Sequence, residues 1–244
     1  MKSLFKVLSI VLFSTLMFSC SQDDDDDIIN GNNSNNNLKK GQVEIKGYPD
    51  KDNKMSFVAT ATKITIDWGD GSVDELTPNG VGCVFVHEYA NQNLQTIKIN
   101  TEAMTSMSLS SRNSVYNAKG TYNELRLGDC PDLKDLSCSY QNLTVLSIKS
   151  APVLESLYCD YNQLTSLNVS GCPALIYLDC RNNQLTAEGL NSLFNSLHSN
   201  EVEYGGVVYI SNNPGTNTCD RTIAENKGWS VWSSYHGDYY LHFP

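Results

Sequence analysis

Three kinds of hydrophobic pattern follow one another along the chain. In the first, short runs such as Val43-Glu44-Ile45 and Ile64-Thr65-Ile66 alternate apolar and polar residues, and turn-forming segments such as Gly69-Asp70-Gly71 separate them. Period-two runs between closely spaced turns are typical of half-buried strands in a small β-sandwich. We therefore predict a β-sandwich over residues 39–103.

The second pattern is a 21-residue repeat over residues 125–186. The same residue types recur once per repeat in six columns: Leu127, Ile148 and Val169; Pro131, Pro152 and Pro173; Leu133, Leu154 and Leu175; Leu136, Leu157 and Leu178; Cys138, Cys159 and Cys180; Leu143, Leu164 and Leu185. A repeat of this length buries its apolar side chains only by stacking on the next copy. We predict a solenoid over residues 104–186, in which residues 104–110 form a degenerate first coil.

The third pattern is helical and follows the last repeat. Apolar residues at positions 190, 193, 194 and 197 have the spacing of a helix, and Thr186 stands at the position of an N-cap. Val207–Ile210 then predicts a strand, Asp220–Lys227 a short helix and Trp229–Trp232 a last strand. Residues 187–244 are therefore predicted to form an α/β cap, and the fold class is mainly β.

Two segments resemble known families. Ile66-Asp67-Trp68-Gly69-Asp70-Gly71-Ser72, followed by His87-Glu88-Tyr89, resembles the WGDG and HxY signatures of PKD-type (polycystic-kidney-disease-like) domains, which have an immunoglobulin-like fold. The 21-residue unit resembles the short leucine-rich repeats of bacterial surface proteins, including internalin-like arrays. That second resemblance implies that Asn162 and Asn183 bond turn amides of the coil. In the earliest full copy the same position is Gln141, with Asn142 beside it, which predicts an irregular ladder there.

The N-terminus has the pattern of a secretory signal. Lys2 and Lys6 precede an apolar run from Val7 to Phe18, which is shorter than the roughly 20 residues that span a bilayer. The run ends in Leu16-Met17-Phe18-Ser19-Cys20, which resembles the lipobox of bacterial lipoproteins. We expect residues 1–19 to be a lipoprotein signal peptide and Cys20 to be acylated, palmitate included. An ordinary signal peptide with an incidental cysteine is the alternative.

The segment behind Cys20 predicts a tether. Residues 21–38 contain five Asp and six Asn and almost nothing to bury, so residues 20–38 are expected to be a lipid-anchored disordered linker. Asp23–Asp27 resembles the surface-export signal of some Gram-negative lipoproteins, which places the protein on the outer membrane, facing outward. The alternative is a solvated acidic linker that repels anionic headgroups.

The charge balance excludes some partners. The whole chain carries −10, and the part from Lys39 onward carries −7, so much of the acidity belongs to the tether. Clustered Lys and Arg are lacking, which argues against a nucleic-acid partner. No nucleophile–base pair, phosphate-binding loop or pair of catalytic carboxylates emerges from the sequence, so we expect neither an enzyme nor a cofactor.

The spacing of the cysteine, histidine and aspartate residues argues against a metal site, and the geometry of stacked rungs argues against disulfides. The cysteines and histidines form no CxxC or HExxH motif, and we expect no metal site. Calcium ligation by Asp67, Asp70 and Asp74 would lack the full calcium-loop pattern, and His236, Asp238 and His242 fit no known ligand spacing. Adjacent rungs, about 4.8 Å apart, would allow disulfides by distance, but their Cβ vectors run side by side. We therefore predict mostly free thiols.

The outward positions of the predicted parallel strands form the candidate ligand-binding surface. They are Asp135, Ser137, Ser139, Ser156, Tyr158, Asp160, Tyr177, Asp179 and Arg181, flanked by Tyr140 and Tyr161. Tyrosine offers contact area at low entropic cost, which suits peptide or glycan ligands. Three rungs alone give a strip of roughly 150–200 Å², well below the about 800 Å² that each side of a standard interface buries.

These features predict a monomeric cell-surface lipoprotein that binds a protein or peptide. A glycan-capturing accessory lipoprotein and a structural spacer are the alternatives. The aromatic and histidine residues between Trp229 and Phe243 pack in the cap or, alternatively, form a sugar-stacking platform.

Overall fold

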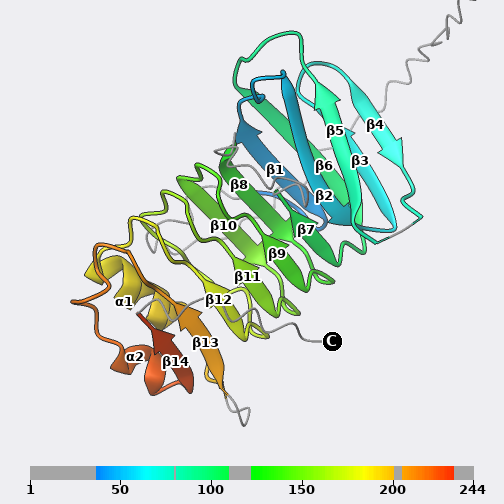
Figure 1. Cartoon of the computed structure of the whole chain (residues 1–244). Coiled ribbons are helices and arrows are strands. Elements are labelled where there is room, and N and C mark those ends of the chain that lie inside the picture. Colours follow the sequence, from blue (N-terminus) through cyan, green and yellow to red (C-terminus); the bar gives the residue numbers. More distant parts are fainter. Residues whose placement is uncertain (1–36, 80, 110–121, 201–204, 234–244) are drawn as a thin grey trace, which may run out of the picture. The chain divides into compact units, whose positions relative to one another are not determined.

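The computed structural model describes residues 37–79, 81–109, 122–200 and 205–233, and it is mainly β, with two sheets and two helices in these residues (Figure 1). The predicted signal peptide, Cys20, nearly all of the tether and the tail beyond residue 233 lie outside the described residues. Within the described part, neither helix has the length and hydropathy needed to cross a membrane.

Every pair of strands formed within residues 42–102 is antiparallel, as expected of short alternating runs joined by turns. Val43, Ile45, Ile64 and Ile66 face inward and their polar neighbours face outward, which confirms the period-two prediction. The strands are β1 (Gln42–Gly47), β2 (Lys54–Thr60), β3 (Lys63–Asp67), β4 (Val73–Leu76), β5 (Cys83–Glu88) and β6 (Gln95–Glu102).

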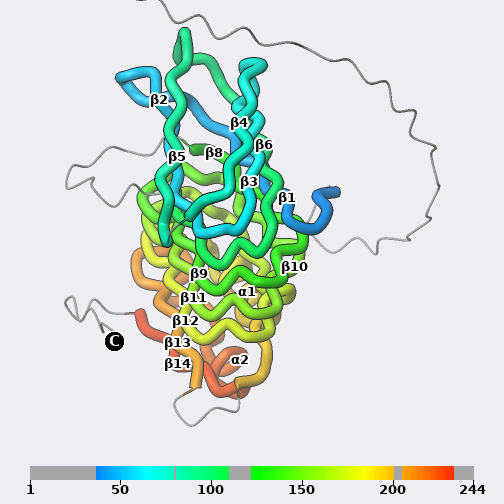
Figure 2. The backbone as a smooth tube through the Cα atoms, turned by 90° about the vertical axis from the view of Figure 1, so that its right-hand side faces the viewer, coloured from blue at the N-terminus to red at the C-terminus, as the bar shows by residue number. Residues whose placement is uncertain are grey.

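The repeat region forms parallel strands. Leu136, Leu157 and Leu178 lie side by side in three successive strands, so one 21-residue repeat is one turn of the chain (Figure 2). The strands of this half are β7 (Ser106–Ser108), β8 (Tyr122–Asp129), β9 (Asp135–Ser137), β10 (Val145–Ser150), β11 (Ser156–Tyr158) and β12 (Tyr177–Asp179).

The two halves share both sheets. One sheet has the order β10-β8-β1-β6-β3-β4, and we call it sheet A; the other, sheet B, has the order β14-β13-β12-β11-β9-β7-β2-β5. In sheet A, β8 pairs antiparallel with β1 and parallel with β10; in sheet B, β7 does the same with β2 and β9. The predicted boundary at residue 103 therefore interrupts neither sheet, and one continuous apolar core runs from Val43 to Trp229.

Trp68 fills the core of the antiparallel half. Its side chain is 1% exposed and packs against Phe57 and His87, with ring centroids 5.9 and 4.9 Å away. Its indole N–H donates to Asp74 Oδ2 at 2.9 Å, and its carbonyl accepts the Tyr89 hydroxyl. The residues that resemble the WGDG and HxY signatures thus lie in one cluster.

The aspartates of the Gly69–Gly71 turn are held by the turn itself. Asp67 accepts the backbone N–H of Gly69, and Asp70 accepts that of Ser72, as expected of Asp beside exposed turn amides. The hydroxyl of Ser72 and the ring of His87 also hydrogen-bond Asp70 and lower the pKa of its carboxyl to about 2.

A ladder of asparagine side chains satisfies the turn amides of the stacked coils, which confirms the roles predicted for Asn162 and Asn183. Each Oδ1 accepts a leucine N–H of the preceding coil, and each Nδ2 donates to backbone carbonyls of two coils. Asn213 continues the ladder into the cap. Gln141, in the first full repeat, leaves its buried Oε1 without a hydrogen-bond partner, so the predicted irregularity is present.

The C-terminal elements follow the predicted order: α1 (Ala187–Ser196), β13 (Gly206–Tyr209), α2 (Thr222–Glu225) and β14 (Trp229–Trp232). Thr186 is the N-cap of α1, since its hydroxyl accepts the N–H of Gly189 at 3.2 Å. The apolar face of α1 is buried through Leu190, Leu193 and Phe194. Strands β13 and β14 extend the parallel part of sheet B beyond β12.

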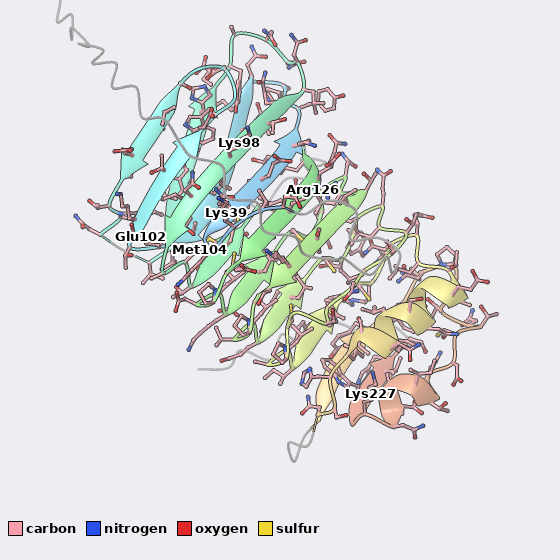
Figure 3. All side chains as sticks on the ribbon, turned by 180° about the vertical axis from the view of Figure 1, so that it is seen from behind. Lys39, Lys98, Glu102, Met104, Arg126 and Lys227 are labelled. Atoms are coloured by element: carbon pink, nitrogen blue, oxygen red, sulfur yellow. The ribbon has the colours of Figure 1, made fainter. Side chains whose placement is uncertain are left out.

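Lys227 fastens the C-terminal end of α1 (Figure 3). Its ammonium donates to the carbonyls of Phe194, Asn195 and Leu197 at 3.1, 2.7 and 2.7 Å. A cation at this end satisfies carbonyls that the helix leaves unpaired and complements the helix dipole.

Replacing Lys227 with Met should therefore lower the free energy of unfolding by about 1.5–3 kcal/mol, the usual range for hydrogen bonds that involve a charged group. Urea unfolding followed by circular dichroism measures the change. Lys98→Met, at an exposed position of β6, is the control and should shift the midpoint little. Equal midpoints for the two variants would contradict the role assigned to Lys227.

Candidate functional site

The outer face of sheet A carries charges that pair with one another. Lys46 Nζ lies 3.6 Å from Glu44 and 3.3 Å from Glu124, and Arg126 lies 3.1 Å from the same Glu124 oxygen. Figure 3, which shows the molecule from behind, labels Arg126 and Lys98 on this sheet. Such a face is typical of a solvated surface, because its charges already have partners on the same sheet.

The outer face of sheet B carries a row of aromatic rings instead. Tyr158, Tyr177, Tyr209 and Trp232 come from the four neighbouring strands β11, β12, β13 and β14. Successive ring centroids are 4.9, 5.6 and 6.4 Å apart, within the range of favourable aromatic pairs. We call these four residues the aromatic ladder. The Arg181 guanidinium lies over the Tyr209 ring, 5.3 Å from its centroid.

The ladder is on the surface because strand residues alternate between the two faces. Leu157 and Leu178 are fully buried, whereas Tyr158 beside Leu157 is 36% exposed. Trp232, at the far end, is 41% exposed. A contacting molecule therefore reaches the exposed parts of rings that are held in place by their neighbours.

A second aromatic pair lies at the corner after the parallel strands. Tyr140 and Tyr161 stack with ring centroids 4.2 Å apart and an interplanar angle of 11°. Both have positive φ, 57° and 53°, which is uncommon for a tyrosine, while Asn182 and Asn212 take the same backbone conformation farther along the chain. Tyr140 is 55% exposed, so this corner presents rings at positions where asparagine fits the backbone better.

Three of the predicted outward residues are buried, which corrects the expectation that they form an open surface. Ser139 is 8%, Asp160 7% and Asp179 2% exposed. The strands end at residues 137, 158 and 179, so Ser139 and Asp160 lie in the corner, where neighbouring coils cover them. Ser139 donates its hydroxyl to Asp160.

Asp179 is buried for a different reason. Arg181 folds back over it and donates from Nε and Nη2 at 2.9 and 2.7 Å, and tyrosine rings lie on both sides. Arg181 itself remains partly exposed. The remaining predicted residues, Asp135, Ser137, Ser156, Tyr158 and Tyr177, are exposed or half-buried on the outer face, so the structure brings them together with the ladder.

Burial and the neighbouring Asp179 raise the pKa of Asp160 to about 6, against the effect of the Ser139 hydroxyl. An acid whose pKa is raised by folding opposes folding when it is ionised. Its contribution is therefore destabilising above about pH 6, and the penalty disappears as the pH falls through 6 towards the ordinary value of 3.8.

Asp160→Asn should accordingly stabilise the protein at pH 7.5, by about 1–3 kcal/mol, because the amide oxygen still accepts the Ser139 hydroxyl without the charge. The gain should shrink to nearly nothing at pH 4. Melting temperatures of both proteins across this range measure the difference. A gain that is the same at both pH values would contradict the assignment of the penalty to the ionised carboxylate.

Tyr209 and Trp232 lie beside Tyr158 and Tyr177, although the sequence analysis placed both in the cap and considered Trp232 for binding only within an alternative sugar-stacking platform. Tyr209 pairs with Asp179 and Trp232 pairs with Tyr209 in the parallel register. The sequence could have indicated this. If the predicted strands Val207–Ile210 and Trp229–Trp232 are aligned with the Leu178 column, the Tyr209 and Trp232 rings fall on the outer face. The alignment is hidden since α1 lengthens the spacing between β12 and β13 beyond 21 residues.

A hollow of about 310 Å³ lies beside the first ring of the ladder. We call it the Tyr158 hollow. It lies over β2, β7, β9 and β11 of sheet B, and its lining residues are Val58, Gly82, Ser106, Met107, Ser108, Asp135, Leu136, Ser137 and Tyr158.

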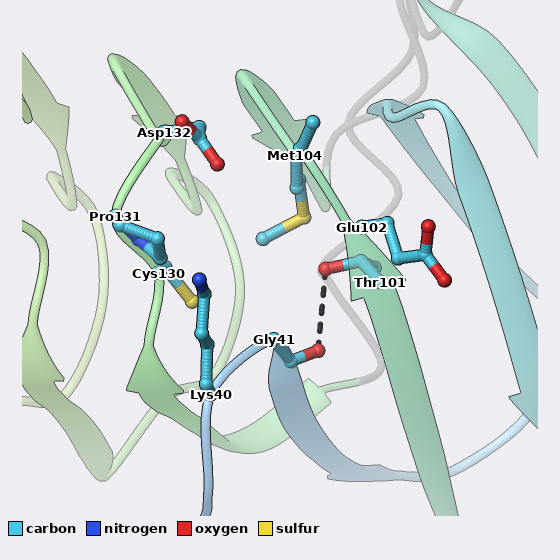
Figure 4. A pocket seen from close by; sticks show the side chains of 9 residues that line it. Lys40, Gly41, Thr101, Glu102, Met104, Cys130, Pro131 and Asp132 are labelled. Atoms are coloured by element: carbon cyan, nitrogen blue, oxygen red, sulfur yellow. Dashed lines mark hydrogen bonds between the residues drawn. The ribbon is translucent and has the colours of Figure 1, made fainter.

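A second hollow, of about 290 Å³, lies where the two halves of the chain meet (Figure 4). Lys40, Glu102 and Asp132 are among its lining residues. The backbone defines its wall, because the Thr101 N–H and hydroxyl both donate to the carbonyl of Gly41, at 2.8 and 3.2 Å. Gly41 has φ of 71°, and a Cβ there would lie 2.2 Å from the Thr101 carbonyl oxygen, so the feature belongs to the packing of the junction.

Ser72, His87 and Asp70 lie together like a catalytic triad but lack its geometry. Ser72 Oγ lies 3.3 Å and Asp70 Oδ2 2.7 Å from the same ring nitrogen, Nε2 of His87. A general base needs one ring nitrogen for the nucleophile and the other for the orienting carboxylate. This cluster therefore stabilises the turn.

The seven cysteines in the described residues are free thiols. Burial raises the pKa of Cys130 and Cys172 to about 12, and it raises the pKa of Cys138, Cys159 and Cys180 still further, so these are protonated, apolar side chains of the core. Among the residues that the structure describes, no group of three or more His, Cys, Asp or Glu side chains is arranged to hold a metal ion.

No protein-family model matches the chain, and no curated protein or solved structure matches it at a significant level.

Proposed function

We propose that this chain is a non-enzymatic, lipid-anchored cell-surface protein that binds a protein or peptide ligand through the outer face of sheet B. In this proposal the antiparallel half is a PKD-like sandwich, the parallel half is a short leucine-rich-repeat solenoid, and Cys20 carries the lipid anchor to the outer membrane. The aromatic ladder is the observation that carries it. Tyr, Trp and Arg are the residue types most enriched at binding hot spots, and the ladder presents Tyr and Trp while Arg181 lies over its Tyr209 ring.

The size of the face supports an extended ligand. Eight strands spaced about 4.8 Å apart, each presenting about 10 Å of its length, give a face of roughly 400 Å². That is larger than three repeats alone could offer, because β13, β14, β7, β2 and β5 belong to the same sheet. It is about half of what one partner buries in a standard interface, which suits a peptide segment or a loop better than a flat protein surface.

The test displays the full chain on cells and probes it with arrays of peptides and of glycans. Peptides should bind, and Tyr177→Ala/Tyr209→Ala, which removes the two central rings, should abolish that binding. Lys98→Ala/Arg126→Ala, on the outer face of sheet A, is the matched control and should leave it unchanged. Binding that survives the loss of both rings would overturn the proposed site. Binding to glycans alone would overturn the ligand class, and no binding on either array would favour a structural spacer.

A further inference from the structure

The Tyr158 hollow exists because the outer residues of sheet B change abruptly in size. On one side of Tyr158 its register neighbour is Asp179, and the tilted Tyr177 ring lies beside it; on the other side the neighbours are Ser137 of β9 and then Ser108 of β7. The aromatic ladder thus ends at Tyr158, and beyond it the surface drops to small side chains. Val58 of β2, the register neighbour of Ser108, is the apolar side chain on this face, whereas Met107 and Leu136 point into the core.

The hollow carries negative charge. Asp135 lines it, and its carboxylate has a pKa raised by burial and by the nearby Glu155. Within the described residues Asp135 hydrogen-bonds Ser156 and takes part in no salt bridge, although Lys134 is close enough to lower its pKa. Burial and then the same carboxylate raise the pKa of Tyr158, which places Asp135 near that ring.

We propose that the Tyr158 hollow is a subsite for one basic side chain, lysine or arginine, of the bound peptide. The proposal rests on the proposed function and names what the peptide must contain. Val58 packs against the methylene stem, the face of Tyr158 contacts the cation, and Asp135 neutralises it. A volume of about 310 Å³ is at the lower end for ligand sites and suits a single side chain. A cation also relieves the repulsion between Asp135 and Glu155.

The experiment titrates the full chain with small amides that carry one side chain each and follows amide shifts by NMR. Nα-acetyl-lysine amide and Nα-acetyl-arginine amide should shift the resonances of Ser106 and Ser137, whereas the isosteric Nα-acetyl-norleucine amide should not. Asp135→Asn should weaken binding about tenfold, and Asp132→Asn, an equal charge change in the other hollow, should not. Binding should also weaken from pH 7 to pH 4, as Asp135 becomes protonated; Glu155 and Lys134 face the same carboxylate, and Lys134 keeps its charge.

Ser137→Tyr separates the subsite from the ladder. The new ring would occupy the place next to Tyr158 and fill the hollow, so binding of the basic amides should be lost while the ladder stays intact. Equal binding of norleucine and lysine amides, or equal effects of Asp135→Asn and Asp132→Asn, would overturn the proposal. A response to methyl glucoside instead would reassign the hollow to a saccharide.

The two proposals fail separately. If peptides on the array require Tyr177 and Tyr209 for binding but bind equally well to Asp135→Asn, the proposed function stands and the subsite is refuted. If the lysine and arginine amides bind but no peptide on the array binds, the hollow is supported as a site for basic side chains and the proposed peptide-binding function is refuted.

Discussion

Trp68→Ala should lower the free energy of unfolding by about 3–5 kcal/mol, the usual cost of removing a large buried aromatic side chain. The indole is 1% exposed, contacts Phe57 and His87, and hydrogen-bonds Asp74. Because both sheets and the core continue into the leucine repeats, we expect the whole described structure to unfold in one transition, before and after the substitution.

The chain contains its own reporters for this experiment. Trp68 is removed by the substitution, and the two remaining tryptophans, Trp229 and Trp232, both lie in β14 at the opposite end of sheet B. In Trp68→Ala their fluorescence should change at the same, lowered urea concentration as the far-ultraviolet circular dichroism. Trp232→Ala, at a 41%-exposed position, is the matched control and should shift the midpoint much less. Fluorescence that keeps the wild-type midpoint while the dichroism changes earlier would show two independent domains.

Asn183→Ala should cost about 3–5 kcal/mol, although it removes only a small side chain. Its Nδ2 donates to the carbonyls of Cys159, Cys180 and Arg181 at 2.9, 3.2 and 3.2 Å, and its Oδ1 accepts the Leu164 N–H at 2.9 Å. Alanine leaves the buried amide and at least one carbonyl without a partner, and each such group costs about 1–3 kcal/mol.

Thermal unfolding measures this loss, and Gln184→Ala, at the exposed position next to Asn183, provides the control. We expect the control to change the melting temperature little. The loss from Asn183→Ala should exceed the loss from Gln141→Ala, because Gln141 donates its side-chain amide to the Ser139 carbonyl but leaves its Oε1 unpaired. The opposite order would contradict the assignment of Gln141 as the member of the asparagine ladder that is only partly hydrogen-bonded.

Local patterns were enough to predict most elements of the fold. Alternation predicted β1 and β3, the Leu136 column predicted the parallel register, and the Thr186 cap predicted the start of α1. In each case the deciding interaction lies within one element or between copies of one repeat. The sequence could therefore be interpreted without knowing how distant segments pair.

The features that sequence reasoning missed depend on such distant pairing. The sharing of sheets rests on β7, in the predicted first coil, pairing with β2 as well as with β9, and no spacing indicates the pairing with β2. The aromatic ladder is complete only because Tyr209, which follows the α1 connection, pairs with Asp179 in sheet B. Asp160 is covered by Ser139 of the preceding coil, and Asp179 is covered by Arg181 of its own coil. Strand alternation predicts which face a side chain is on, but it does not predict that another side chain folds over it.

The register of the coils has a consequence for how such a chain can change its length. Because each 21-residue unit places its leucines directly beside those of the next, duplication of one unit would insert a rung without disturbing either end, and sheet B would grow by about 4.8 Å. Insertion of a single residue would instead turn the leucines of that strand outward. Recombination among gene copies should thus yield longer and shorter forms in whole units, each with a binding face of a different reach.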